Sequence, residues 1–303
     1  MKVLTRHSSR SRHFFKKENR TRYVIPILGT PEKNKECFAL RIVVCIKQVP
    51  DVAEIRIDEI KHTLIRSGVP SILNPFDEFA VEEALKVRES FGGNVTAISM
   101  GPLQAKEALY KCLAMGIDRA ILLSDSKFAG ADTWATARTL AMTIQKIGFD
   151  LVICGMKAVD GETCQVGPQV AELLDIPHVS YVKRLDVNVD GKSLVAERMT
   201  EQGHQVVRSS IPCLLTASKA LNLPRLSTLI NQMAAKKKII EIFTAEDIGA
   251  QKEQVGLPGS RTHVLKVYTP DLSTGKGKIV SGDDLDSAIT QLLELFKKDG
   301  ITQ

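Results

Sequence analysis

Apolar and polar positions alternate along residues 40–175 with two different periods. Short apolar runs rich in β-branched residues predict buried strands at 40–50, 94–100, 119–123 and 150–154. Apolar residues that recur every three or four positions predict helices over 74–90, 104–115, 132–147 and from 166 onward. Gly116 should end the second of these helices, Asp132 should cap the third, and Gly148 should follow its end. Because strands alternate with helices, we expect an α/β fold with a mostly parallel, doubly wound, Rossmann-like sheet.

The pattern changes after residue 175. Two strand-like arms within 178–200 flank Asp190 and Gly191, a dipeptide that favours a hairpin turn. Residues 204–217 add further strand. The sheet should therefore carry an antiparallel part.

The C-terminal part of the chain has a less regular pattern. Residues 236–303 are broken by Gly and Pro until a short amphipathic helix near the end. A tail this long with little core of its own is expected to wrap a partner. We therefore predict a basic extension over 1–39, an α/β domain over 40–235 and an extended C-terminal arm over 236–303.

The formal net charge of +6 belongs to one segment rather than to the fold. Residues 1–40 hold ten Lys or Arg and three Glu, so the rest of the chain is nearly neutral. We therefore expect no nucleic-acid surface on the folded domain. The extension 1–39, rich in Arg and Ser, is interpreted as disordered or not native, as a targeting peptide, or as a nucleic-acid or membrane arm.

The apolar runs are too short to span a membrane, so no membrane span is expected. The cysteines are scattered and form no CxxC pair; they are Cys37, Cys45, Cys112, Cys154, Cys164 and Cys213. This distribution favours reduced, buried thiols in a cytosolic protein over a zinc or iron–sulfur site. We expect the cytoplasm rather than the mitochondrial matrix.

The candidate chemistry lies between the last predicted parallel strand and the next helix. Gly155 ends the strand, a polar loop containing Asp160 and Gly161 follows, and helical spacing begins at Val166. Pro168 suits a first helical turn because it has no N–H to lose there. A strand, a small polar loop and a helix start form the usual phosphate-binding arrangement of α/β proteins. The segment therefore predicts a nucleotide site without a GxGxxG or a P-loop.

Several motifs resemble the β subunit of electron-transfer flavoproteins. They are IKQVPD at 46–51, NPFDEFAVEEAL at 74–85, AMGIDRAILL at 114–123, the loop up to Pro168, and LNLPRLSTL at 221–229 followed by AAKKKIIE. The resemblance covers about residues 40–268 in family order. It implies a heterodimer with an α subunit that holds one FAD loosely in a mobile domain.

The resemblance also implies an adenine nucleotide in this subunit. Ordinary members hold AMP there, whereas the electron-bifurcating branch holds a second FAD that takes hydride from NADH. The segment VDGETCQVGP at 159–168 is similar to the bifurcating pattern DGDTAQVGP, with Glu162 for Asp and Cys164 for Ala. Gly161 would give the backbone close approach and leave room for a dinucleotide. We expect FAD, with AMP or a plain loop glycine without ligand as the alternatives.

Site residues follow from matching the family motifs. The positions implied to contact the cofactor are Cys45, Asn74, Pro75, Phe76, Asp77, Met100, Met156, Lys157, Ala158, Val159, Asp160, Gly161, Glu162, Thr163, Cys164, Gln165, Val166 and Gly167. Structural alternatives exist for half of them: Asn74 as a turn residue, Asp77 as a helix N-cap, Phe76, Cys45 and Met100 as core, Met156 and Val159 as packing residues, Lys157 as a solvated cation, and Asp160 as the side chain of an Asx turn. No catalytic acid or base is expected, because the flavin carries the chemistry.

The partners follow from the same resemblance. The segment 218–235 resembles the family's recognition loop, whose leucine, here Leu229, inserts into a dehydrogenase; the alternative is a loop folded back on its own domain. We expect an acyl-CoA or hydroxy-acid dehydrogenase and ferredoxin or flavodoxin as redox partners. The chain would be a carrier subunit of a bifurcating flavoprotein. The alternatives are a conventional single-FAD carrier with AMP here, or a stand-alone adenine-nucleotide-binding module.

Overall fold

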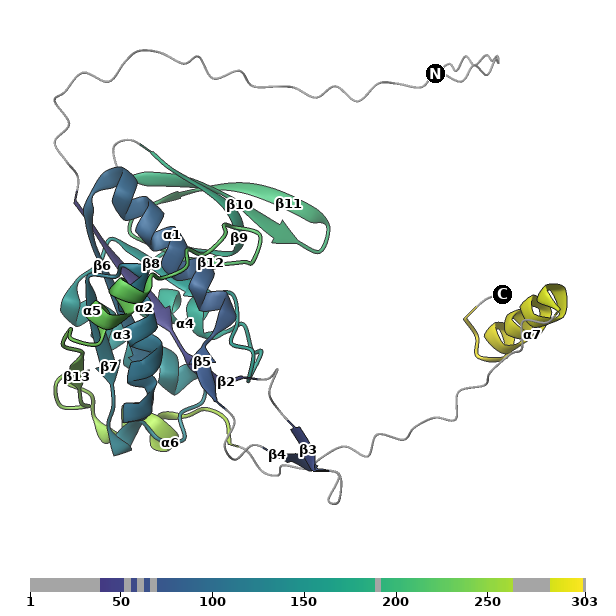
Figure 1. The fold of residues 1–303 in the computed structure, drawn as a ribbon, viewed down its shortest axis with the longest axis horizontal. Helices are drawn as coiled ribbons and strands as arrows, with labels where there is room; N and C mark the ends of the chain where they lie inside the picture. Colours follow the sequence, from purple (N-terminus) through teal and green to yellow (C-terminus); the bar gives the residue numbers. More distant parts are fainter. Residues whose placement is uncertain are drawn as a thin grey trace, which may run out of the picture. The chain divides into compact units, whose positions relative to one another are not determined.

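The computed structural model describes residues 39–51, 56–58, 63–65, 70–188, 192–263 and 284–301 (Figure 1). The central element is a nine-stranded sheet of order β11-β10-β9-β12-β8-β1-β6-β7-β13. Its strands are β1 (Leu40–Ile46), β6 (Gly93–Met100), β7 (Arg119–Leu123), β8 (Leu151–Gly155), β9 (His178–Val187), β10 (Ser193–Thr200), β11 (Gly203–Ser210), β12 (Cys213–Ala217) and β13 (Glu241–Phe243). The pairs from β9 to β13 are parallel, and β9, β10 and β11 pair antiparallel. The predicted α/β class, mostly parallel with an antiparallel part, is confirmed.

Helices cover both faces of the sheet. The core on one face contains residues of α1 (Pro75–Phe91), α2 (Lys106–Met115) and α5 (Leu229–Ala235). The core on the other face contains residues of α3 (Thr133–Ile147) and α4 (Val166–Leu173). Because both faces are covered, the central strands bury successive residues, which explains their continuous apolar runs.

Short elements complete the described part of the chain. They are the strands β2 (Gln48–Pro50), β3 (Arg56–Asp58), β4 (Thr63–Ile65) and β5 (Ser71–Leu73), the 3-10 turns η2 (Leu103–Ala105), η3 (Ser126–Phe128) and η4 (Lys252–Gln254), and the helices α6 (Gly256–Gly259) and α7 (Leu285–Lys298). No helix in the described ranges is long and apolar enough to cross a membrane.

Helix ends that depend on local chemistry lie where the sequence predicts them. Asp132 caps α3, its carboxylate accepting the Ala135 N–H at 2.9 Å, and Gly148 ends the helix. Gly116 ends α2 with a left-handed φ of 119°. The turn predicted at 190–191 lies outside the described residues, as does the extension up to residue 38.

The predicted strand over 40–50 is wrong as a single element. It is interrupted at Lys47, and β2 pairs with β5 instead of continuing the main sheet. The cause is long-range: the Lys47 N–H donates to the Asp77 carboxylate at 2.7 Å, and its carbonyl accepts the Asn74 N–H at 2.9 Å. The chain therefore leaves the sheet where the candidate site begins.

The predicted arm does not begin at residue 236. β13 extends the sheet beside β7, and Ile240, Ala245 and Ile248 are buried. Arg119 of β7 pairs with Glu241 of β13, with Nε–Oε1 at 2.6 Å. These contacts attach the first part of the expected arm to the domain. Residues 264–283 lie outside the described part, and the terminal amphipathic helix is α7.

Candidate functional site

The site lies where the strand order reverses. From β1 the chain passes to β6 and β7 on one side, and then crosses to β8 on the other. Loops leaving the carboxyl ends of β1 and β8 therefore diverge, and α/β proteins place ligands in the crevice formed there. Lys47 follows the end of β1, and Gly155 ends β8.

The side chain of Asp77, in the first turn of α1, lies beside both of these strand ends. It is buried, and its carboxylate accepts the backbone N–H groups of Lys47 and Gly155. Burial raises the pKa of Asp77 to about 7, although hydrogen bonds from Asn74 and both backbone groups oppose the shift. Its interpretation as the helix N-cap is wrong: Asn74 occupies the N-cap position of α1, and Asp77 bonds outside the helix.

Gly155 is required by this arrangement. A Cβ on Gly155 would lie 2.2 Å from Asp77 Oδ1 and 2.9 Å from the Phe76 carbonyl carbon. Both neighbours are fixed, one by hydrogen bonds and the other by the first turn of α1. Only glycine lets β8 end this close to the helix.

Asn74 holds the start of the loop that follows β8. Its side chain donates to the Lys157 carbonyl at 2.9 Å and accepts the Val159 N–H at 3.2 Å. The residue is 1% exposed. Its amide is therefore engaged by the loop backbone and by Asp77, and its contribution to any ligand acts through the position of that loop.

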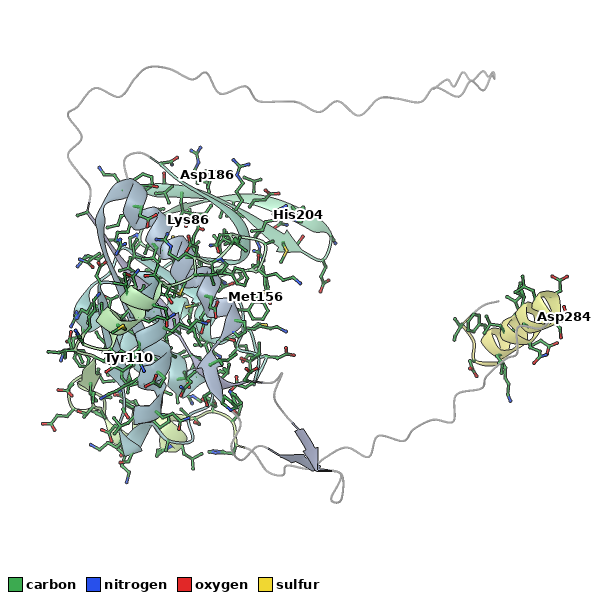
Figure 2. All side chains as sticks on the ribbon, in the orientation of Figure 1. Lys86, Tyr110, Met156, Asp186, His204 and Asp284 are labelled. Atoms are coloured by element: carbon green, nitrogen blue, oxygen red, sulfur yellow. The ribbon has the colours of Figure 1, made fainter. Side chains whose placement is uncertain are left out.

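Two ion pairs hold the loop 156–165. Lys47 Nζ lies 2.6 Å from Asp160 Oδ2, which ties the loop to the end of β1. Lys157 Nζ lies 2.5 Å from Glu162 Oε1 within the loop itself. Met156, labelled in Figure 2, donates its N–H to the Ala217 carbonyl at the end of β12, at 3.0 Å. The loop is thus anchored to three strand ends.

The loop also presents free donors and an open position. Gly161 would accept a Cβ with no atom within 4 Å, and within the described residues Thr163 makes no hydrogen bond through its hydroxyl or its amide. Glu162 and Cys164 have left-handed φ values of 51° and 57°. Such conformations in non-glycine residues cost about 1–3 kcal/mol each and cluster at ligand-binding sites.

Helix α4 begins directly after this loop. Gln165 takes the N-cap position without a side-chain capping bond, and its Oε1 accepts the Thr133 hydroxyl at 3.2 Å. The first amides of any helix lack intrahelical partners and attract anions. A Cβ on Gly167 would lie 2.8 Å from Thr216 Cγ2, so glycine allows α4 to pack closely on β12. Val166 begins the helix as the sequence predicts.

The remaining predicted residues surround the same strand ends. Cys45 and Cys154 are neighbours on β1 and β8, and their contact raises the pKa of the buried Cys45 thiol. Met100 ends β6 and is half-buried. Pro75 is exposed at the first position of α1, and the Phe76 ring centroid lies 5.7 Å from Lys157 Nζ.

Two residues of this region were missed. Lys47 lies in IKQVPD, but only the fold brings it to Asp160. Tyr181 of β9 has a left-handed φ of 60°, and the neighbouring Cys164 raises the pKa of its hydroxyl. Neither contact has a local sequence signal.

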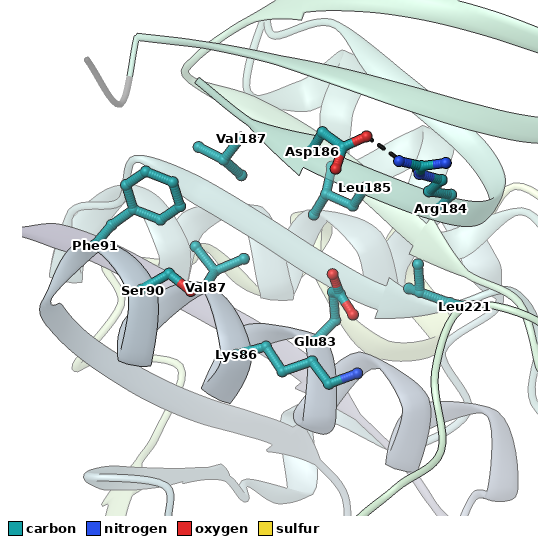
Figure 3. A pocket seen from close by; sticks show the side chains of 10 residues that line it. All are labelled: Glu83, Lys86, Val87, Ser90, Phe91, Arg184, Leu185, Asp186, Val187 and Leu221. Carbon is teal, nitrogen blue, oxygen red and sulfur yellow. Dashed lines mark ion pairs between the residues drawn. The ribbon is translucent and has the colours of Figure 1, made fainter. Parts of the chain in front are cut away.

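A cavity of about 290 Å³ lies elsewhere, between the second half of α1 and β9 (Figure 3). Its lining includes the buried Glu83, whose pKa is raised by burial, and the Arg184–Asp186 ion pair. Glu83 accepts the Asn222 amide at 2.9 Å. None of the residues that line this cavity belongs to the loop 156–165.

Leu229 is the first residue of α5 and is 77% exposed. The preceding segment is attached by polar groups: Arg225 Nε lies 2.8 Å from Glu82, and Arg225 Nη1 lies 2.6 Å from Glu89. The apolar side chains around Leu229 remain exposed; they are Leu223, Leu226, Ile230, Met233 and Ile239. The segment is therefore held on α1 without burying its leucines.

Comparisons with known proteins agree with the motifs. The family described as "Electron transfer flavoprotein domain" matches residues 61–248. "Electron transfer flavoprotein subunit beta" of Thermoanaerobacterium thermosaccharolyticum is 49% identical, over 84% of this chain and 97% of that protein. "Caffeyl-CoA reductase-Etf complex subunit CarD" of Acetobacterium woodii is 44% identical over 86% and 100%. "Protein FixA" of Azorhizobium caulinodans is 40% identical over 86% and 95%. The chain therefore belongs to the electron transfer flavoprotein family, among its β subunits.

Proposed function

We propose that this subunit binds FAD at the loop 156–167 and works, in a heterodimer with an α subunit, as an electron-bifurcating flavoprotein. NADH would be the electron donor, with ferredoxin or flavodoxin as one acceptor. The α-subunit flavin, and then an acyl-CoA or hydroxy-acid dehydrogenase, would form the other branch. The complex would operate in the cytoplasm.

The observation that carries the proposal is the open, donor-rich loop at the reversal of strand order. Gly161 has free space around it, and Thr163 has both its hydroxyl and its amide without partners in the described residues. Unpaired donors beside a helix start suit phosphate oxygens. Free space at Gly161 suits a ligand that continues beyond one phosphate. A similarity to the CarD subunit of a caffeyl-CoA reductase–Etf complex adds support.

The protein would supply position and electrostatics. Bound FAD would contribute the redox chemistry, accepting two electrons and releasing them singly. Asp77 and Asn74 would hold the strand ends and the loop in place. Asp160, oriented by Lys47, could accept a ribose hydroxyl.

The exposed leucines at 223–229 fit a dehydrogenase contact. Leu223, Leu226 and Leu229 are at least 77% exposed, while Arg225 fixes the backbone between them. Exposed apolar anchors on a positioned segment are typical of protein interfaces. Lys236, Lys237 and Lys238 would form a charged rim, which speeds association more than it strengthens binding.

The test is a cofactor count. The chain is co-expressed with its α subunit, the purified heterodimer is denatured, and the released cofactors are separated by chromatography. Two FAD per heterodimer are expected. One FAD with one AMP would contradict the proposal and indicate the conventional carrier. A stable monomer that turns over ATP would indicate a stand-alone nucleotide module.

A matched pair of variants tests the position of the ligand. Gly161→Ala should lower the β-site FAD content without changing stability, because the added methyl occupies open space that the ligand would use. Gly249→Ala is the control for an added Cβ outside the loop, since it also meets no atom within 4 Å. Its left-handed φ of 68° adds a backbone cost of about 1–2 kcal/mol, so FAD content is compared per folded heterodimer. Equal FAD content in the two variants would place the ligand away from Gly161.

A further inference from the structure

Arg198 lies on the same edge of the sheet as the nucleotide loop. In the strand registers, Gly155 of β8 pairs with Ala217 of β12, Ala217 with Val182 of β9, and Val182 with Arg198 of β10. This row crosses three strand spacings, or about 14 Å. Arg198 therefore stands level with the carboxyl end of β8, three strands away across the sheet.

The Arg198 side chain lacks a partner in the described part of the chain. Its Nε is buried without a hydrogen bond, and no described carboxylate lies within 4.0 Å to form an ion pair. The neighbouring Glu197 is engaged by Lys183 at 2.9 Å. A buried guanidinium donor left unsatisfied is unusual and indicates a missing acceptor.

Tyr181 links Arg198 to the loop. Its left-handed backbone lies where the register between β9 and β12 shifts, and its N–H donates to Thr216 Oγ1 at 2.9 Å. Its hydroxyl contacts Cys164, and the charges of Arg198 and Lys157 act on that hydroxyl. Positive φ in an aromatic strand residue is a genuine outlier, so the strand is distorted where it meets the loop.

We infer that Arg198, with the Tyr181 hydroxyl, binds a phosphate of the nucleotide beyond the one held by the loop. This inference rests on the proposed nucleotide site and extends it along the sheet edge. Lys157 is neutralised by Glu162, which leaves Arg198 as the uncompensated cation of the cluster. Guanidinium groups bind phosphate oxygens through paired donors, which suits the free Nε.

The position of Arg198 should also distinguish nucleotides with one phosphate from those with two. A mononucleotide places its only phosphate at the loop, so no further phosphate extends toward Arg198. A ligand with a diphosphate continues along that row. Arg198 should therefore contribute to ADP and FAD binding but not to AMP binding.

The experiment uses the heterodimer with the α-subunit flavin retained and the β-subunit site emptied. AMP, ADP and FAD are titrated separately by calorimetry into the wild type, Arg198→Ala, Arg198→Lys and Tyr181→Phe. Arg208→Ala is the control, because it removes the same charge from an exposed position on the adjacent strand β11. Arg198→Ala should weaken ADP and FAD by about 10- to 100-fold and leave AMP within about twofold.

The other variants separate the contributions of the Arg198 charge, the Arg198 Nε donor and the Tyr181 hydroxyl to the affinity. Arg198→Lys keeps the charge but loses Nε, and should recover only part of the affinity. Tyr181→Phe should weaken ADP by a few-fold. Thermal unfolding of each variant shows whether folding is intact, and Arg198→Lys serves if Arg198→Ala does not fold.

Three results would overturn the inference. Arg198→Ala could bind all three nucleotides as Arg208→Ala does, or it could lose AMP as strongly as ADP. Alternatively, both Arg198 variants could impair assembly with the α subunit while nucleotide affinity stays unchanged, which would make Arg198 a subunit contact. If the wild-type heterodimer bound ADP but not FAD, the proposal of a second flavin would fail. The comparison of ADP with AMP affinity would still test the role of Arg198.

Discussion

Gly155→Ala is the substitution with the most specific structural consequence. The new Cβ would lie 2.2 Å from Asp77 Oδ1 and 3.0 Å from the Asp77 backbone nitrogen. The carboxylate cannot rotate away without losing the Lys47 N–H bond of 2.7 Å and the bond from the Gly155 N–H. The helix start cannot move without disturbing the Asn74 contacts to the loop. Any movement that relieves this clash must therefore break or lengthen these hydrogen bonds.

The magnitude follows from two contributions. Overpacking a well-packed core costs about 1–3 kcal/mol. Hydrogen bonds to a charged group contribute about 1.5–3 kcal/mol, and at least one would be lost or lengthened. We expect a destabilisation of about 3–5 kcal/mol, a large fraction of the about 5–15 kcal/mol that stabilises a typical domain. For a chain of this size that corresponds to a Tm lower by about 6–20 °C.

Gly161→Ala provides the matched control for this prediction. Gly161 lies six residues further along the same segment, and its added Cβ would meet no atom within 4 Å. Measured with the nucleotide removed, its stability should change by no more than about 0.5–1 kcal/mol in either direction. Urea unfolding of both variants, followed by circular dichroism, measures the difference. Equal unfolding midpoints would refute the claim that Asp77 fixes the end of β8.

Three further predictions follow from the same contacts. Because the folded pKa of Asp77 is raised to about 7 from 3.8, its contribution to stability is present at acid pH and lost as pH rises through about 7. Wild-type unfolding free energy should fall between pH 4 and 8 by up to about 4 kcal/mol, and Asp77→Asn should flatten this dependence; an equally steep fall in the variant would contradict it. Asn74→Ala should destabilise the protein by about 2–4 kcal/mol and speed hydrogen exchange at the Val159 amide, which loses its acceptor. An unchanged exchange rate at Val159 would show that Asn74 does not hold the loop. Leu229→Ala should slow electron delivery to the dehydrogenase by about tenfold or more with cofactor content intact, while Leu103→Ala, equally conservative and 59% exposed, should not; equal effects of the two would remove Leu229 from the interface.

Features set by neighbouring residues were predictable from the sequence. The cap at Asp132 and the stop at Gly116 depend on a few adjacent backbone groups, and both lie where predicted. The parallel strands were visible because burial on both faces demands continuous apolar runs. The position of the loop after β8 followed from the order of elements alone.

Features set by distant residues were not predictable in this way. The interruption at Lys47 depends on Asp77, thirty residues away in the sequence, accepting a backbone N–H. β13 has only three residues and is held in the sheet by pairing with β7 and by the Arg119–Glu241 ion pair. Its sequence therefore carries too short a pattern to separate it from an irregular arm.

The shape of the nucleotide loop is imposed largely from outside its own sequence. Asn74 holds its beginning, Lys47 holds Asp160, and Tyr181 contacts Cys164 near its end. The strained residues of the loop persist because these contacts come from three different elements. The choice of ligand should therefore depend on residues at the carboxyl edge of the sheet as well as on the loop. The family motif at 159–168 contains only some of the residues that decide which nucleotide binds. An exchange of that segment alone for an AMP-type sequence would leave Lys47, Asn74 and Tyr181 in place at the sheet edge, so these residues would still act on whichever ligand binds there.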